Sequence, residues 1–122
     1  MSDEFLKVAR QEIQLELDEL ERIVLHCNND EHIFKNSQSI KVHLHKIKGL
    51  APMMGQEKIG ELAKMSDSIL RYIMSEGPLP GSCLIILKTV EDMKKIFGGL
   101  NIYDLSDFKK QVHDMFPQIS EV

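Results

Sequence analysis

The chain has 122 residues, of which 43% are hydrophobic and 28% are charged, and its net charge is −4. This composition indicates one folded domain over residues 1–122 and argues against a nucleic-acid-binding protein, which would usually be basic. No apolar run approaches the roughly 18 residues of a membrane span, and the charged first residues form no signal peptide. The two cysteines fit neither a metal site nor a disulfide framework. We therefore expect a cytoplasmic protein without membrane, metal or nucleic-acid binding.

Hydrophobic residues recur at three- and four-residue steps in the first half of the chain, which predicts helices. We expect one helix over residues 4–27 and a second over residues 31–54, with Asp30 as the N-cap of the second. The second helix should end in a loosened turn, because Pro52 lacks an amide hydrogen and Gly55 can adopt a left-handed conformation. The expected buried stripes are Leu6, Ala9, Ile13, Leu17, Leu20, Val24 and Cys27 in the first helix and Ile40, Leu44, Ile47, Ala51 and Met54 in the second.

The second half of the chain continues the helical pattern. A third helix is expected over residues 57–75, a loop over residues 76–81, and a fourth helix over residues 83–97 capped by Ser82. A short fifth helix should start at Asp104 or Ser106 and run through Phe116. Long helices with short connections pack as antiparallel neighbours, so the predicted fold is all-α: an antiparallel up-down four-helix bundle with an additional short C-terminal helix. The expected stripes are Ile59, Leu62, Ser66, Ile69 and Ile73, and then Leu84, Leu87, Val90, Met93, Lys94 and Phe97.

One segment of this acidic chain is locally basic. Residues 35–56 contain four lysines and two histidines but no acid. At about 100° per residue, His45 points roughly 140° away from the buried stripe of its helix. Lys48 follows about one turn later, and Gly49 leaves bare backbone there although a mid-helix glycine costs about 0.5–1 kcal/mol relative to alanine. An outward imidazole beside a cation and open backbone is a candidate nucleophile.

The neighbours of His45 decide between several kinds of site. His43 and His45 do not form a metal site, because residues two apart on a helix point about 200° away from each other. If the second and third helices fold back near Gln56, His45 and Asp67 lie at the same height. Asp67 would then fix the imidazole tautomer and leave the other nitrogen as the nucleophile. The alternative is that Asp67 is a surface charge or a salt-bridge partner of Lys48.

The sequence HKIKG at residues 45–49, followed by Gly55 ten residues after the histidine, resembles the HxxKG signature of histidine-containing phosphotransfer (HPt) domains. The match is closest over about residues 39–70, and the helical layout extends it to most of the chain. HPt domains are helical bundles that carry a phosphoryl group on one exposed histidine, between aspartates of receiver domains. The long first helix and Asp67 are most similar to the N-terminal phosphotransfer domain of chemotaxis histidine kinases, which is phosphorylated from ATP bound by a separate kinase domain.

The resemblance implies that His45 is the phospho-accepting nucleophile, that Lys48 offsets the phosphoryl charge, and that Asp67 orients the imidazole. It implies a phosphocarrier rather than an autonomous enzyme, whose partner is a response-regulator receiver domain, a histidine kinase or both. No cofactor of its own is expected, because the Mg²⁺ belongs to the partner. We expect a monomer whose functional face stays free. The partner-binding residues would be Lys41, Gly49, Leu50, Met53 and Lys64.

Two questions stay open at this point. The start of the chain and its polar tail over residues 118–122 favour a free-standing relay protein over one domain of a larger kinase. A competing class of function is a non-catalytic helical adaptor, which would have the same bundle but would not be phosphorylated.

Overall fold

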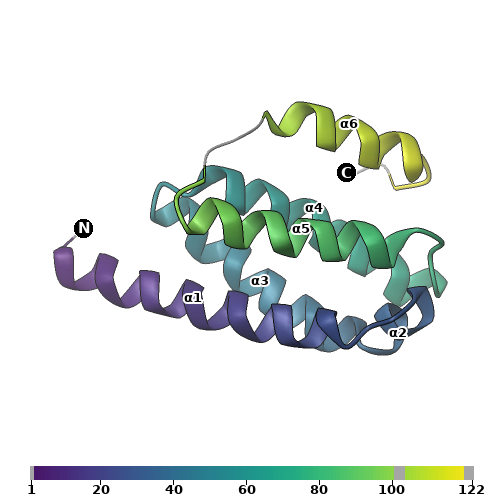
Figure 1. The fold of residues 1–122 in the computed structure, drawn as a ribbon, viewed down its shortest axis with the longest axis horizontal. Helices are drawn as coiled ribbons and strands as arrows, with labels where there is room; N and C mark the ends of the chain where they lie inside the picture. Colours follow the sequence, from purple (N-terminus) through teal and green to yellow (C-terminus); the bar gives the residue numbers. More distant parts are fainter. Residues whose placement is uncertain (1, 101–103, 120–122) are drawn as a thin grey trace.

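The computed structural model describes residues 2–100 and 104–119, so the last three residues of the polar tail lie outside it. The described part is helical and contains no strand, which confirms the all-α class (Figure 1). None of its helices is both long enough and apolar enough to cross a membrane. The helices are α1 (Asp3–Leu25), α2 (Asp30–Lys35), α3 (Ser37–Met53), α4 (Glu57–Glu76), α5 (Ser82–Phe97) and α6 (Leu105–Met115).

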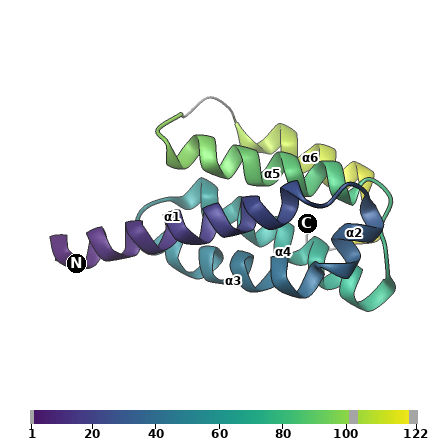
Figure 2. The same cartoon turned by 60° about the horizontal axis from the view of Figure 1, so that its bottom comes forward.

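The long helices pack around one hydrophobic core. α1 contacts α3, α3 contacts α4, α4 contacts α5, and α5 contacts α1. The short α2 lies at the end where α1 connects to α3, and α6 lies along the side of the molecule away from α1 and α3 (Figure 1). In Figure 2, α3 forms the lower edge of the molecule, so one face of α3 is left uncovered by other helices.

The first turns of α1 project beyond the ends of the other helices in both ribbon views (Figures 1 and 2). The helix begins after Ser2, whose hydroxyl accepts a hydrogen bond from the amide of Phe5 at 3.1 Å. Because no neighbouring helix covers this end, Leu6 is 36% exposed, and its predicted burial was wrong. The remainder of the predicted stripe, from Ala9 to Cys27, is buried.

The single helix predicted over residues 31–54 is in fact two helices, which meet at Asn36. The side-chain amide of Asn36 donates to the carbonyl of His32 at 2.8 Å, and this local bond competes with a continuous helix. The predicted N-cap was also wrong by one residue. Asn29 caps α2 by accepting the amide of His32 at 2.9 Å, and Asp30 is the first residue of the helix.

Asp30 instead caps the start of α5. Its carboxylate accepts the amides of Gly81 at 3.0 Å and Cys83 at 2.8 Å, and the hydroxyl of Ser82 at 3.4 Å. Ser82 is buried and makes no capping hydrogen bond, so the prediction that it caps this helix was wrong. A carboxylate at the N-terminus of a helix satisfies free amides and interacts favourably with the helix dipole. Asp30 thus joins two segments that are 51 residues apart in sequence.

The buried face of α5 is rotated relative to the prediction. Leu84, which was expected inside, is 74% exposed, and Leu87 is only half-buried. α4 and α1 both pack against α5. The buried face of α5 is therefore broader than the single stripe of residues, three and four apart, that the sequence predicted. The buried residues are Ser82, Ile85, Ile86, Thr89, Val90, Asp92, Met93 and Phe97.

α3 and α4 form the hairpin that carries the candidate site. α3 ends in a turn containing Pro52, and Gly55 follows with a φ of +74°, as predicted. The two helices approach closely where Gly60 of α4 faces the proline, since a Cβ on Gly60 would lie 3.0 Å from the Pro52 Cγ. The predicted stripes are buried, with Met54 half-buried: Ile40, Leu44, Ile47 and Ala51 in α3 and Ile59, Leu62, Ser66, Ile69 and Ile73 in α4.

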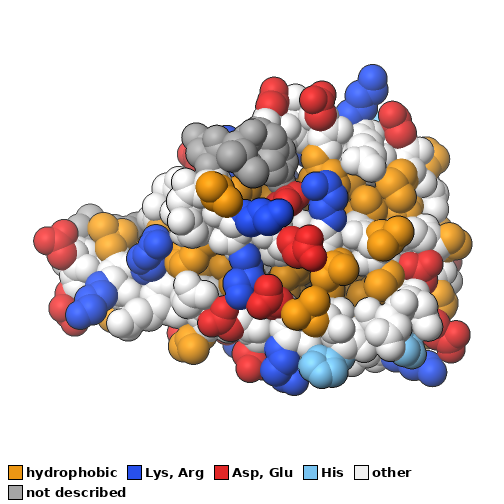
Figure 3. Space-filling model, in the orientation of Figure 1, with side chains coloured by type: hydrophobic (Ala, Val, Ile, Leu, Met, Phe, Trp, Pro, Cys, Tyr) orange, Lys and Arg blue, Asp and Glu red, His pale blue; other side chains and the backbone are white. Residues whose placement is uncertain are grey.

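On the face seen in Figure 3, acidic and basic side chains are interspersed. One group of charges links α5 to α1: the ammonium of Lys94 lies 2.8 Å from Glu21 and 3.0 Å from Asp18. Hydrogen bonds to Glu21, and then to Asp18, raise the pKa of Lys94 above its ordinary value.

Candidate functional site

His45 stands on the outer face of α3, near the middle of the helix, and its side chain is exposed. The neighbouring residues Leu44 and Ile47 have no exposed surface, so the burial of the opposite face fixes the rotation of the helix. Within the described residues, no hydrogen bond or ion pair occupies the imidazole. Both ring nitrogens are therefore open to an approaching molecule.

A hollow adjoins the imidazole along two turns of α3. Three of its lining residues carry positive or titratable nitrogen atoms: Lys41, His45 and Lys46. Gln38 and Val42 complete the lining. An anionic group attached to His45 would therefore have the Lys41 ammonium within one turn of the helix.

Gly49 lies one turn after His45, and a Cβ at this position would meet no atom within 4 Å. Internal packing therefore does not require a glycine here. Of the other expected partner-binding residues, Leu50 is half-buried, Met53 is 48% exposed and Lys64 is exposed. Lys64 and Lys48 line a groove between α3 and α4. Leu50 follows Lys48 by two residues, so it points about 200° away from Lys48 and packs against the core. The expected partner-binding residues therefore do not all lie on one face.

Asp67 lies on α4 and is only 2% exposed. Its Oδ2 atom accepts a hydrogen bond from the Lys48 ammonium at 3.1 Å and lies 3.5 Å from Arg71 Nε, while Oδ1 faces the Lys41 ammonium at 3.7 Å. Such partners offset the loss of hydration of a buried carboxylate. Of the two alternatives left by the sequence, the structure places Asp67 against Lys48, and no hydrogen bond to His45 is present within the described residues.

The two lysines held by Asp67 flank the imidazole. Lys41 precedes His45 by four residues and Lys48 follows it by three, so both lie within one turn of the helix. Their side chains are 28% and 33% exposed, respectively, so the ammonium groups reach the surface. One buried acid thus keeps two positive charges on the α4 side of His45.

The opposite flank of α3 has a second buried carboxylate, which the sequence reasoning missed. Glu16 of α1 is 6% exposed; its Oε2 contacts Nδ1 of His43, and its Oε1 lies 3.2 Å from the Lys46 ammonium. The available signal was the spacing, because Glu16 follows Ile13 by three residues and so occupies a core position of α1. α3 is therefore held between two buried acids, with His45 between the two flanks.

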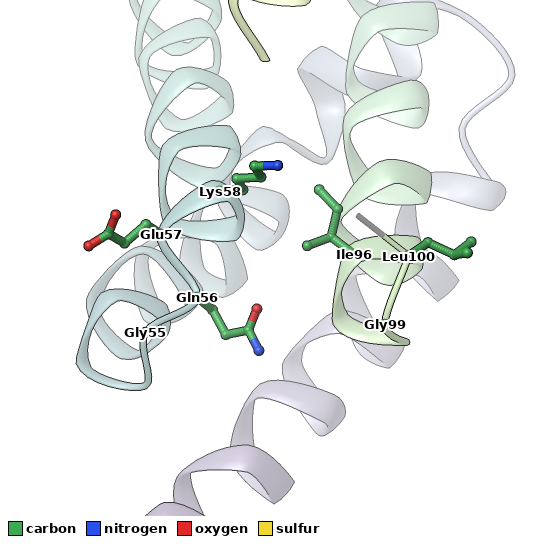
Figure 4. Close-up of a pocket in the computed structure, with 7 residues that line it drawn as sticks. All are labelled: Gly55, Gln56, Glu57, Lys58, Ile96, Gly99 and Leu100. Carbon is green, nitrogen blue, oxygen red and sulfur yellow. The ribbon is translucent and has the colours of Figure 1, made fainter. Parts of the chain in front are cut away.

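Within residues 2–100 and 104–119, no group of three or more His, Cys, Asp or Glu side chains is placed to bind a metal ion. A hollow also lies between the α3–α4 turn and the end of α5, where Gln56 points toward α5 and Glu57 points away (Figure 4). Its lining offers no histidine or cysteine nucleophile: Gly55, Gln56, Glu57, Lys58, Ile96, Gly99 and Leu100.

Comparison of the chain with protein-family models, with curated proteins and with solved structures finds no match. The HKIKG segment and the geometry around His45 are therefore the features that bear on the chemistry of this site.

Proposed function

We propose that this protein is a histidine phosphocarrier of a two-component phosphorelay. In this proposal His45 accepts a phosphoryl group and exchanges it with the aspartate of a response-regulator receiver domain. The observation that carries the proposal is the exposed, unpaired imidazole on a helix whose flanking lysines are held by Asp67. We also propose that α1, α3, α4 and α5 form an antiparallel up-down bundle, and that the protein acts in the cytoplasm as a monomer.

The transfer would begin with attack of the unprotonated ring nitrogen of His45 on the phosphorus of the receiver's acyl phosphate. The new N–P bond forms as the P–O bond to the aspartate breaks, and the aspartate leaves as a carboxylate. Phosphoryl transfer depends mainly on positioning and on neutralising the charge of the transferred group. Lys48 and Lys41 would contribute to that neutralisation, the receiver would supply Mg²⁺, and Gly49 would leave room for the receiver to approach.

The contacts of Asp67 favour a relay carrier over the phosphotransfer domain of a chemotaxis kinase. The resemblance to the chemotaxis domains implied that Asp67 orients the imidazole of His45. Asp67 bonds instead to Lys48 and lies near Lys41 and Arg71. In the proposed function Asp67 therefore positions cations rather than the imidazole.

The proposal is tested by incubating the protein with phosphorylated receiver domains, and separately with histidine kinases, Mg²⁺ and radiolabelled ATP. The wild-type protein should acquire phosphate that is labile in acid and stable in base. The variant His45→Gln should acquire none from a receiver.

The matched control is His113→Gln, which changes another exposed histidine, on α6. This variant should accept phosphate as the wild type does. Normal phosphate uptake by His45→Gln, with both variants folded by circular dichroism, would contradict the proposal. Absence of phosphate uptake by the wild-type protein would also contradict it and would favour the non-catalytic adaptor.

A further inference from the structure

A second histidine on α3 has the carboxylate partner that His45 lacks. Nδ1 of His43 contacts Oε2 of Glu16, and no described residue occupies its other ring nitrogen. In a neutral imidazole bonded in this way, Nδ1 carries the hydrogen and donates it to the carboxylate. The lone pair is then on Nε2, which is the arrangement required of an imidazole nucleophile.

The surroundings of His43 repeat the residue pattern found at His45. His43 and Lys46 have the spacing HxxK, as do His45 and Lys48, but on a different face of the helix. Lys46 is half exposed, and its ammonium lies 3.2 Å from Oε1 of Glu16. The cation is therefore available beside His43 without a change in the backbone.

Accessibility limits what can react there. The His43 side chain is 19% exposed and contacts Glu16 of α1, whereas His45 is exposed on the outer face of α3. A receiver domain must bring its aspartate pocket over the acceptor nitrogen, and α1 obstructs that approach to His43. A small molecule needs no such clearance.

The charge around His43 is close to balanced. Glu19 also lies in this region, but it is paired with Arg22 at 2.9 Å. The hydrogen bond from Arg22 lowers the pKa of Glu19, and the imidazole of His43 would add a smaller lowering when it is protonated. An anionic donor would therefore meet Glu16 and Glu19 together with their cations Lys46 and Arg22.

We propose that His43 is a second phosphoryl-accepting imidazole, that Glu16 is its positioning residue, and that its substrates are small phosphoryl donors with a good leaving group, such as acyl phosphates and phosphoramidate. Phosphoramidate reacts in its zwitterionic form, in which the nitrogen is already an ammonium group. Nε2 of His43 attacks phosphorus, the new N–P bond forms, and the old P–N bond breaks with release of neutral ammonia. Nδ1 keeps its hydrogen, so no proton is transferred in this step, and the positive charge of the phosphorylated ring faces the Glu16 carboxylate.

The test uses the full-length protein and phosphoramidate at about pH 8.5, where ordinary imidazoles with a pKa near 6.5 are unprotonated. The rate of phosphorylation is followed at each histidine by mass spectrometry with a fragmentation method that preserves phosphohistidine. His43 should react at least threefold faster than the exposed His113, although it is the less accessible of the two. In Glu16→Gln the rate at His43 should fall about tenfold, while the rate at His113 in the same molecules stays unchanged.

A structural role of the pair would give the opposite results. If His43 reacts no faster than His113, or if Glu16→Gln leaves its rate unchanged, the proposal is wrong and Glu16 only fastens α1 to α3. Should Glu16→Gln fail to fold, the comparison of the two histidines within the wild-type protein decides the question.

The inference does not depend on the proposed relay function. His45→Gln should lose phosphate uptake from receivers and keep the reaction of His43 with phosphoramidate, so the two proposals can fail separately.

Discussion

Two glycines on neighbouring helices illustrate how differently the same residue type can act. Gly49 faces open space, whereas a side chain on Gly60 would meet Pro52 at 3.0 Å. Gly60 is therefore required by the close approach of α4 to α3. Gly49 weakens its helix without any gain in packing, which is understandable if a partner must come close to His45.

Replacing these glycines by alanine should have opposite effects on stability. Gly49→Ala should raise the free energy of unfolding by about 0.5–1 kcal/mol, because alanine is the better helix former. Gly60→Ala should lower it by about 1–2 kcal/mol through overpacking against Pro52. Urea unfolding measures both changes. Phosphotransfer from a receiver should slow in Gly49→Ala in spite of its higher stability; a faster transfer would contradict the role of Gly49 as clearance.

Asp67 combines stability with the arrangement of charge at the site. Asp67→Asn removes the counter-charge of Lys41, Lys48 and Arg71. Since these cations can still reach water, the loss of unfolding free energy should be about 1–3 kcal/mol, below that for breaking a fully buried pair. The bundle should stay folded, and transfer to His45 should slow. The control Glu61→Gln changes an exposed acid of the same helix and should shift stability by less than about 0.5 kcal/mol.

His45 could be placed on the surface from sequence alone because its helix has a clear buried stripe. The position of that stripe is sufficient to show which side chains of the same helix point outward. The role of Asp67 could not be fixed in this way, since a shared height along two helices does not say which side chain of α3 the carboxylate reaches. The contact between Glu16 and His43 required the packing of α1 against α3, which no spacing within either helix contains.

At the scale of the elements, the helices were predictable and their ends were not. The break at Asn36 and the cap by Asp30 both depend on side-chain hydrogen bonds that do not alter the hydrophobic pattern. The rotation of α5, which exposes Leu84, depends on contacts with two helices at once. Periodicity detects a helix with one apolar stripe more readily than one buried over a broad face.

Asp30 is expected to be the main link between α2 and the start of α5. Asp30→Ala leaves the amides of Gly81 and Cys83 without their acceptor, so the free energy of unfolding should fall by about 1–2 kcal/mol. Hydrogen exchange at these amides should accelerate more than exchange in α3. Glu31→Ala, which removes an exposed ion pair with Lys35, should change stability by less than about 0.5 kcal/mol. If Asp30→Ala and Glu31→Ala lower the free energy of unfolding equally, Asp30 is not the main link between α2 and α5.

At the scale of the whole molecule, the pairs of Lys94 with α1 predict how stability changes in alkaline solution. The pKa of Lys94 is raised in the folded state, so its stabilising effect is complete below the ordinary lysine pKa of about 10.4 and is lost as the pH rises through the raised value. Between about pH 9 and pH 12, the wild type should therefore lose more stability than Lys94→Met. Lys95→Met, at an exposed neighbouring position, should follow the wild type. If the free energy of unfolding falls equally with pH in all three proteins, the ion pairs of Lys94 do not cause the alkaline loss of stability.

Glu16 and Asp67 anchor α3 from both sides, so the lysines around His45 already have counter-ions before any phosphoryl group arrives. Loading the imidazole would then require rotations about a few side-chain bonds and no movement of the backbone. A carrier built in this way would present the same surface to a phosphoryl donor and to a phosphoryl acceptor. The direction of phosphoryl transfer would then depend on which of the two partner proteins is more abundant in its phosphorylated form.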